Sequence, residues 1–263
     1  MMQKFKKKIM TKSDKEGGFI SHITELRTRL IHSFIFLFVF FIFCYFFAEY
    51  LYGFLVEPYA QAVKNDSIER RLIFTALQET FLTYLRVAFF ASFFVTSPFI
   101  LIQIWKFIAP GLYDHEKIAI MPYLVITPIL FFLGGALVYY LIMPLAIKFF
   151  LSFESTGLAT NLPIQLEAKV NEYLSLVMKL IFAFGLSFQL PVVLSLLARV
   201  GVVDSEFLKT RRKYVVVIIF AAAAILTPPD PITQIGLAIP LLILYELSIF
   251  SVRLIEKKSK KDA

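Results

Sequence analysis

The chain has 263 residues, of which 59% are hydrophobic and only 17% are charged, and its mean hydropathy is +0.75. Soluble domains carry about 25% charged residues, so this chain cannot cover a globule with polar surface. The composition excludes an ordinary soluble enzyme and a disordered chain, and it indicates an integral membrane protein.

Uncharged apolar segments predict six membrane-spanning helices. A helix needs about 20 residues to cross a hydrocarbon core of about 30 Å, and backbone groups in lipid must form their hydrogen bonds within the segment. The segments are residues 30–48, 87–105, 119–147, 180–198, 214–229 and 231–245. A basic lead of 29 residues precedes the first segment and no small-x-small site follows it, so we expect no cleaved signal peptide.

Two polar segments flank the first spans. Before the first, His22, Glu25, Leu26 and Arg29 share one face of an amphipathic helix start, because they recur at i, i+3, i+4 and i+7. On that face Glu25 and Arg29 can form an i, i+4 ion pair, which is the simplest interpretation of both. After the second span, residues 105–117 combine an aromatic belt, a Pro-Gly turn and a short acidic cluster, as an interfacial turn would.

Prolines inside the spans predict kinked helices and a curved, concave wall rather than a straight bundle, because each removes a backbone hydrogen bond. Glycines in the third and fourth spans allow close helix contact. The prolines are Pro98, Pro122, Pro128, Pro144, Pro191 and Pro240, and the glycines are Gly134, Gly135 and Gly185.

The last two spans are predicted to be short. Only 13 residues separate Lys213 from the proline-rich break at 227–231, which is about 20 Å of helix against a core of about 30 Å. The return segment is little longer before Glu246. Either Asp230 lies below the membrane surface or the bilayer thins locally, unless the hairpin is simply a shortened structural element.

Charge predicts the orientation. With six spans and both termini on one side, that side carries twenty Lys and Arg residues and the opposite side five. The positive-inside rule then places both termini in the cytoplasm, and the net charge of +8 does not indicate nucleic-acid binding. The predicted organisation is a basic cytoplasmic N-terminus (1–29), a six-span membrane domain (30–252) and a basic cytoplasmic tail (253–263).

No enzymatic or metal-binding motif is found in the sequence. One cysteine and three histidines have no metal-ligand spacing, and no P-loop, nucleophile elbow or dinucleotide fingerprint occurs, so we expect neither an enzyme nor a cofactor. The alternative is a small-solute secondary transporter, which needs ionisable residues near the bilayer midplane. The candidates Glu49, Arg86, Lys179 and Glu246 lie near span ends instead, and no internal repeat is evident.

Four motifs in order resemble the TatC family of twin-arginine translocase subunits, over residues 18–254. They are the segments 22–30, 107–116, 182–191 and 226–230. The resemblance implies an all-α membrane fold and a receptor that binds the paired arginines of signal peptides. It also implies export of folded proteins, driven by the proton-motive force, across the cell inner (plasma) membrane.

The resemblance also implies which residues bind the signal peptide. The glutamates that recognise the signal-peptide arginines correspond to Glu25 and Glu116, and Arg27 and Phe107 match residues that engage the peptide. Two carboxylates suit this task because a guanidinium fork pairs with a carboxylate through two hydrogen bonds, whereas lysine offers a point charge.

Further positions match regions that contact partners. Pro58 matches a functionally important position in the first outer loop, and Thr227, Asp230 and Gln234 match the region where single-span TatA-like and TatB-like partners dock. Gln189 matches a pocket position that is glutamate in many relatives, and an amide cannot ionise. The resemblance also implies a homo-oligomer within the complex and folded precursor proteins as partners.

Overall fold

The computed structural model describes the backbone of residues 2–64, 70–108, 114–155, 162, 164–227 and 230–262. It also describes their side chains, except at 2–22, 105, 106, 108, 114–121, 232 and 258–262. Almost all of this chain is helical. The helices in order are α1 (Met2–Phe46), α2 (Ala48–Val63), α3 (Glu79–Ile108), α4 (Asp114–Leu137), the π-helical turn η2 (Val138–Ile142), α5 (Met143–Leu151), α6 (Val170–Ser187), α7 (Leu190–Arg199), α8 (Ser205–Leu226) and α9 (Pro231–Asp262).

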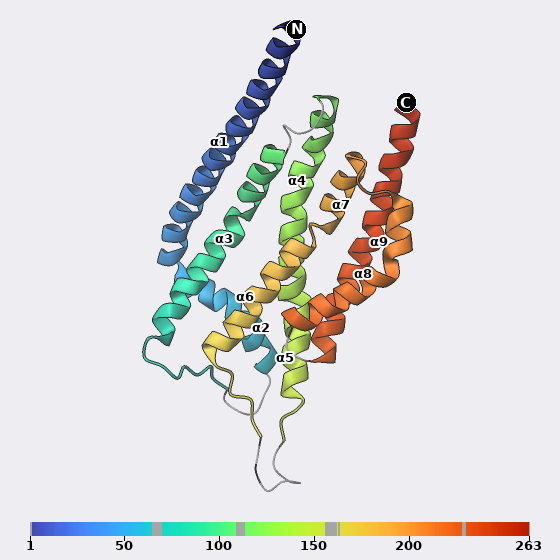
Figure 1. Ribbon diagram of the computed structural model, residues 1–263. Coiled ribbons are helices and arrows are strands. Elements are labelled where there is room, and N and C mark those ends of the chain that lie inside the picture. Colours follow the sequence, from blue (N-terminus) through green and yellow to red (C-terminus); the bar gives the residue numbers. More distant parts are fainter. Residues whose placement is uncertain are drawn as a thin grey trace.

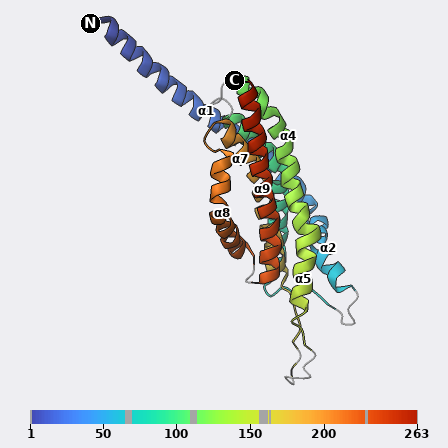
Figure 2. The same cartoon turned by 90° about the vertical axis from the view of Figure 1, so that its right-hand side faces the viewer.

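The helices stand side by side in a wall that is broad in Figure 1 and thin in Figure 2. Both termini lie at one end of this wall, as the sequence predicts (Figure 1). We call it the termini end; it also holds the end of α3 and the start of α4. The opposite end carries α2 and the segments 70–78, 152–155 and 164–169, and we call it the α2 end.

The core lies around α6. Leu174, Val177, Leu180 and Phe184 of this helix are at most 1% exposed, and they pack in one cluster with residues of α2, α3, η2, α8 and α9. In the span Val170–Arg199, which contains α6 and α7, half of an apolar stretch of 18 residues is buried. In the span Ile23–Phe46 of α1, only 6% of such a stretch is buried. The wall is therefore assembled on α6, with α1 at its edge.

Close contact between α4 and α6 depends on glycine, as predicted. A Cβ atom on Gly134 would lie 2.7 Å from the carbonyl oxygen of Phe184, and one on Gly185 would lie 2.7 Å from the ring of Phe131. The missing side chains let the two backbones approach to a distance that alanine would not permit.

Prolines shape the helices where the sequence indicates. Pro144 follows the π-helical turn η2 and stands in the first turn of α5. Pro191 stands at the start of α7, after a break at Phe188 and Gln189 that separates α6 from α7. The other four prolines of the prediction do not interrupt their helices: Pro98 lies inside α3, Pro122 and Pro128 inside α4, and Pro240 inside α9.

Five helices of the described chain are long and apolar enough to cross a membrane. They are Ile23–Phe46, Glu79–Ile104, Pro122–Leu151, Val170–Arg199 and Thr233–Lys257. The predicted span that is not among these five is the fifth, residues 214–229. It corresponds to α8, which has 22 residues but begins with a charged segment that includes Lys209, Arg211, Arg212 and Lys213. Its apolar part is the short one that the sequence predicts.

The prediction that the last helix is also short is wrong. α9 has 32 residues, about 48 Å at the usual rise, and it continues well past Glu246. The Glu246 carboxylate pairs with Arg212 of α8 at 2.6 Å, so this acid does not end the apolar helix. Only α8 is short in its apolar part.

Candidate functional site

The termini end holds Glu25, a predicted recognition residue, on α1. Its Oε1 accepts hydrogen bonds from Nε (3.0 Å) and Nη2 (2.5 Å) of Arg29, one turn further along the helix. Nη1 of Arg29 donates to Oε1 of Gln103 on α3, at 3.0 Å. The side chains of Glu25 and Arg29 remain 33% and 25% exposed. The predicted i, i+4 pair is formed, α3 holds it through Gln103, and solvent still reaches it.

The other predicted recognition residues belong to the same end. Arg27 is exposed on α1, and Phe107 is half-buried in the last turn of α3. Glu116 lies in the first turn of α4, but its side chain is outside the described residues, as is the predicted turn at 110–111. The structure therefore brings Glu25, Arg27 and Phe107 to one end on adjacent helices, with the start of α4 at that end (Figure 1).

Gln189, the predicted pocket residue, is buried in the break between α6 and α7 and is 6% exposed. Its Nε2 donates to the backbone oxygen of Thr127 on α4 at 3.0 Å, and it lies 3.5 Å from the oxygen of Gly185. Its Oε1 is buried with no hydrogen-bond partner in the part of the chain that the structure describes. The amide thus ties α4 to α6 and leaves one acceptor unused.

The predicted docking residues of the α8–α9 hairpin form a buried hydrogen-bonded turn. Asp230 is 5% exposed and caps α9, because its carboxylate accepts hydrogen bonds from the backbone N–H (2.7 Å) and the hydroxyl of Thr233. The Thr227 hydroxyl donates to the oxygen of Ala223 at 2.9 Å. Nε2 of Gln234 donates to the oxygen of Phe220 at 3.2 Å, which joins α9 to α8. Residues 228 and 229 are outside the described chain.

Pro58 is buried inside α2 and leaves a backbone acceptor free. Because proline has no N–H, the oxygen of Phe54 loses its helical partner. The hydroxyl of Tyr139, from η2, donates to this oxygen at 2.7 Å, and the hydroxyl of Tyr173, from α6, donates to the oxygen of Leu55 at 3.1 Å. The proline therefore creates the acceptor through which α2 is fastened to the membrane helices.

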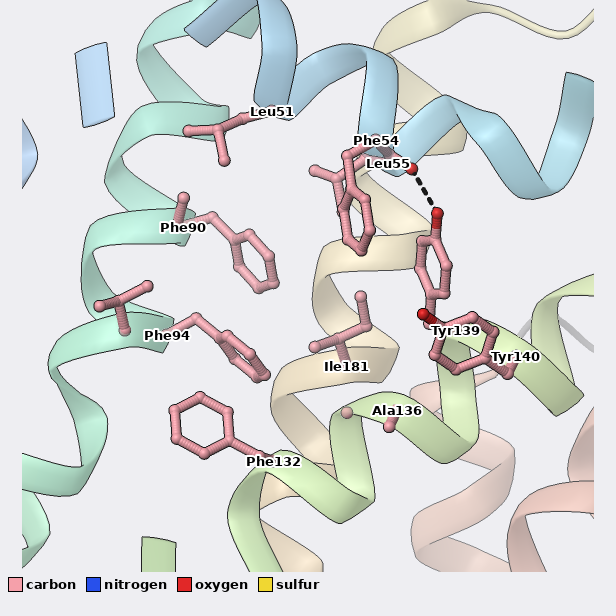
Figure 3. Close-up of a pocket in the computed structure, with 13 residues that line it drawn as sticks. Leu51, Phe54, Leu55, Phe90, Phe94, Phe132, Ala136, Tyr139, Tyr140 and Ile181 are labelled. Carbon is pink, nitrogen blue, oxygen red and sulfur yellow. Dashed lines mark hydrogen bonds between the residues drawn. The ribbon is translucent and has the colours of Figure 1, made fainter. Parts of the chain in front are cut away.

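A cavity of about 310 Å³ lies beside this contact, between α2, α3, α4 and α6. Figure 3 shows Phe90 and Phe94 pointing into it from α3, and the Tyr139 hydroxyl directed away from it toward the oxygen of Phe54. The rings of Phe54 and Tyr139 stack at 4.5 Å. Apolar side chains line the cavity, so it suits hydrocarbon rather than a polar solute.

A buried ion pair joins two connecting segments at the α2 end. Nη1 and Nη2 of Arg70 donate to Oε1 and Oε2 of Glu154, both at 2.6 Å, and the N–H of Leu166 also donates to Oε1 at 2.7 Å. The side chains of Arg70 and Glu154 are 8% and 18% exposed. The hydrogen bonds from Arg70 hold the pKa of the Glu154 carboxyl below its usual range. We call this group the loop clasp.

No group of three or more His, Cys, Asp or Glu side chains in the described residues could hold a metal ion. Among the described side chains, the arrangement offers the Glu25 carboxylate at the termini end, the buried amide of Gln189 and a capped turn at the hairpin.

Comparisons with known proteins decide the family. The family described as Sec-independent protein translocase protein (TatC) matches residues 21–240. The chain belongs to the TatC family. It is 48% identical to the Sec-independent protein translocase protein TatC of Magnetococcus marinus, over 93% of this chain and 87% of that one. It is 36% identical to that of Escherichia coli K12, over 89% and 87%.

A solved structure agrees. A crystal structure named as the twin arginine translocase receptor TatC matches with a TM-score of 0.76 and 39% identity, covering 89% of this chain and 99% of that one. The predicted family and all-α membrane fold are thereby confirmed. The chain is an integral membrane protein of a protein-translocase family, which does not support the solute-transporter alternative.

Several contacts between helices and loops of this TatC family member have no signal in the sequence. Tyr139 and Tyr173 lie far from Pro58 in the chain, although the proline itself signals an unpaired acceptor four residues earlier. Arg70 and Glu154 are 84 residues apart. At the termini end, Nε of Arg199 donates to the Tyr123 hydroxyl at 3.2 Å, and no sequence pattern indicated that contact.

Proposed function

We propose that this chain is the receptor subunit of a twin-arginine translocase, which binds the paired arginines of signal peptides and supports export of folded proteins driven by the proton-motive force. Glu25 and Glu116 are the proposed arginine-binding carboxylates, and Arg27 and Phe107 engage the remainder of the peptide. Membership of the TatC family supports the translocase role.

One observation carries the arginine-binding proposal. The carboxylate of Glu25 already accepts two hydrogen bonds from a guanidinium, that of Arg29, at a position one-third exposed to solvent. A site with this geometry can exchange an internal guanidinium for an incoming one. The surroundings at this end are basic, so an Arg-Arg pair is attracted only where a carboxylate is placed. Recognition should therefore depend on Glu25 and Glu116 individually.

The test measures binding of a precursor to the full chain in membranes. Glu25→Gln and Glu116→Gln keep the size of the side chain but remove its charge. Each should weaken binding by about 1–3 kcal/mol, or about 5- to 150-fold, because a hydrogen bond to a charged group is lost. Photo-crosslinking of a precursor with Arg-Arg, compared with one carrying Lys-Lys, reports the affinity and its specificity.

Glu57→Gln is the matched control. Glu57 is an exposed carboxylate on α2, at the opposite end of the wall, and it accepts a hydrogen bond from Gln61 at 3.0 Å. Its loss should leave precursor binding unchanged. Unaltered affinity in Glu25→Gln, Glu116→Gln and the double variant, with normal insertion, would remove both carboxylates from recognition.

The proposed location is the plasma membrane, with the termini end in the cytoplasm. The placement of both termini at one end, together with the excess of Lys and Arg there, supports this orientation. A cysteine at Ser155, at the α2 end, should react with an impermeant reagent added outside the cell, and one at Ser205 should not. The reverse pattern would invert the orientation.

The α8–α9 hairpin is the proposed docking region for single-span TatA-like and TatB-like partners, within a complex that holds several copies of this chain. Asp230→Asn and Asp230→Ala separate the two possible roles of Asp230, because asparagine caps a helix about as well as aspartate and alanine does not. If the charge serves docking, Asp230→Asn should lower export of a folded reporter while precursor crosslinking survives. Loss of export only in Asp230→Ala would assign the residue to the turn alone.

Two further positions have structural roles in the proposed receptor. Pro58 would contribute to function by fastening α2 to the membrane helices. Gln189 would contribute a hydrogen bond in the pocket, and no step that requires a titrating carboxylate is assigned to it. A protonophore should stop export without reducing precursor binding.

A further inference from the structure

A groove with a mainly apolar lining and a few polar side chains follows one face of α6 toward the end of α8. A cavity of about 750 Å³ is lined there by Asn171, Ser175, Lys179 and Ser187 of α6 and by Ile225 and Thr227 of α8. A second cavity, of about 280 Å³ at the α2 end, shares Asn171 and Glu172 with the first. The two cavities therefore lie next to each other along α6, with the smaller one at the α2 end. We call the larger cavity the α6 groove.

Lys179 is a cation without a counter-ion in this groove. Two charged residues line the larger cavity. Glu172 lies 3.8 Å from the ammonium of Lys169, whereas Lys179 is exposed and has no hydrogen-bond or ion-pair partner within the described chain. Asn171 accepts a hydrogen bond from Arg86 and is already engaged. A charge on a membrane-facing surface needs a polar partner, and here the protein does not supply one.

The depth of Lys179 follows from its place in α6. It lies nine residues after Val170, so its Cα is about 13 Å along the axis from the start of the helix. A helical side chain leans toward the N-terminus of its helix, so the ammonium recovers only part of that distance. The charge therefore lies inside the apolar span Val170–Arg199, more than two helical turns from its start.

The short α8 gives an independent measure of the same depth. Its apolar part, from Tyr214 to Leu226, covers about 20 Å, which is about 10 Å less than the hydrocarbon core. With the basic start of α8 at one headgroup layer, Thr227 lies about 10 Å short of the other. Lys179 and Thr227, from opposite walls of the groove, therefore lie at a similar depth below the surface of the α2 end.

We propose that the α6 groove binds a phospholipid from the leaflet at the α2 end, with the phosphate drawn below the membrane plane onto the ammonium of Lys179. The charge complements a phosphate, and the hydroxyls of Ser175 and Thr227 line the same space. Leu186 and Ile225, which are 47% and 84% exposed, flank the groove and offer acyl chains a surface. A soluble anion has no part that matches these two residues. A lipid held here thins the bilayer beside α8.

The test is native mass spectrometry of the full chain with phosphatidylglycerol added to delipidated protein. Lys179→Gln should lower the affinity for the bound lipid at least tenfold, Lys179→Arg should retain it, and Lys179→Glu should abolish it. Lys148→Gln is the matched control, because Lys148 is an exposed lysine in the last turn of α5, at the α2 end but outside the groove. It should bind lipid as the unaltered chain does. The expected order of lipid affinities follows the charge of the side chain at position 179, and a general folding defect would not produce that order.

Competition identifies the occupant. Inorganic phosphate and glycerol phosphate at millimolar concentration should not displace the lipid, and Ile225→Gln should weaken lipid binding because the acyl chains lose their surface. Displacement by either small anion would overturn the lipid proposal in favour of a simple anion site. Equal lipid affinity in Lys179→Gln, Lys179→Glu and Lys148→Gln would show that the groove is not a lipid-binding site. Co-purification of a single-span protein that blocks lipid binding would show that a protein occupies the groove instead.

Discussion

Helices α1 and α6 have the same apolar character, but the molecule uses them differently. Each belongs to a segment that is long and apolar enough to cross a membrane, yet 6% of the apolar stretch is buried in α1 and 50% in the segment that contains α6 and α7. α6 is enclosed by its neighbours, and the connecting segments before it are fixed by the loop clasp and by a bridge between Ile73 and Lys169. α1 packs mainly along α3. Hydropathy therefore predicts that a helix enters the membrane, but not whether it carries the fold.

The ion pair in the connecting segments near α6 and the ion pair on α1 differ in the same way. The Arg70–Glu154 pair joins distant segments and is mostly buried, whereas Glu25 and Arg29 pair within one helix and stay accessible. A buried pair loses much when one partner is removed, and an exposed one loses little. We infer that substitutions around α6 affect stability and those on α1 affect binding.

The largest effect is expected at the α4–α6 contact. Gly134→Ala places a Cβ 2.7 Å from the backbone oxygen of Phe184, and because backbone cannot swing aside, the two helices must separate. The free energy of unfolding in mixed micelles should fall by about 3 kcal/mol or more, the upper end of the usual cost of overpacking. Gly53→Ala on α2 is the control, since nothing lies within 4 Å of its Cβ position. Equal stability of both variants would contradict this tight contact.

The loop clasp should give the next effect. Glu154→Gln removes the carboxylate that accepts both guanidinium hydrogen bonds and leaves the mostly buried Arg70 without its counter-charge. We expect a loss of about 2–3 kcal/mol in the free energy of unfolding. Glu172→Gln, at a side chain 74% exposed and 3.8 Å from Lys169, should change it by less than about 0.5 kcal/mol. Similar losses in both variants would argue against a special role for the clasp.

The clasp should also respond to pH. The pKa of Glu154 is lowered in the folded chain, so its stabilising effect is fully present above the ordinary pKa of glutamate, about 4.3. This effect is lost as the pH falls below that value through the folded pKa. The unaltered chain should therefore lose more stability than Glu154→Gln does on acidification through this range, as thermal unfolding of both will show. Parallel pH profiles would contradict the assignment.

A smaller effect, with a specific signature, is expected for α2. Tyr139→Phe leaves the oxygen of Phe54 without its donor, at a cost of about 1–2 kcal/mol. Pro58→Ala restores an N–H four residues after Phe54, so the same tyrosine substitution should cost less in that background. Thermal unfolding of the four proteins of this double-mutant cycle measures the coupling. Strict additivity would show that the tyrosine does not replace the missing proline N–H.

The sequence predicted features that depend on local spacing. Five of the six predicted spans, the presence of glycines that allow close helix contact and the Glu25–Arg29 pair follow from composition, residue type or i, i+4 spacing. The length of α9 was missed, because the partner that accommodates Glu246, Arg212, lies on another helix. Tyr139 was missed for a related reason, since its contact with α2 joins residues 85 positions apart and its helix contains a π-helical turn. Pairings across such distances have no local signal.

The smallest effect on stability is expected for Arg29→Gln. Its pair with Glu25 is an accessible i, i+4 interaction, and such pairs contribute about 0.3–0.5 kcal/mol. The further hydrogen bond to Gln103 keeps the total below about 1 kcal/mol. Glu25→Gln should be equally mild in thermal unfolding but should weaken precursor binding, whereas Arg29→Gln leaves the Glu25 carboxylate available and should preserve it. A stability loss as large as that of Glu154→Gln would mean that α1 carries the fold as α6 does, and the contrast between the two helices would fail.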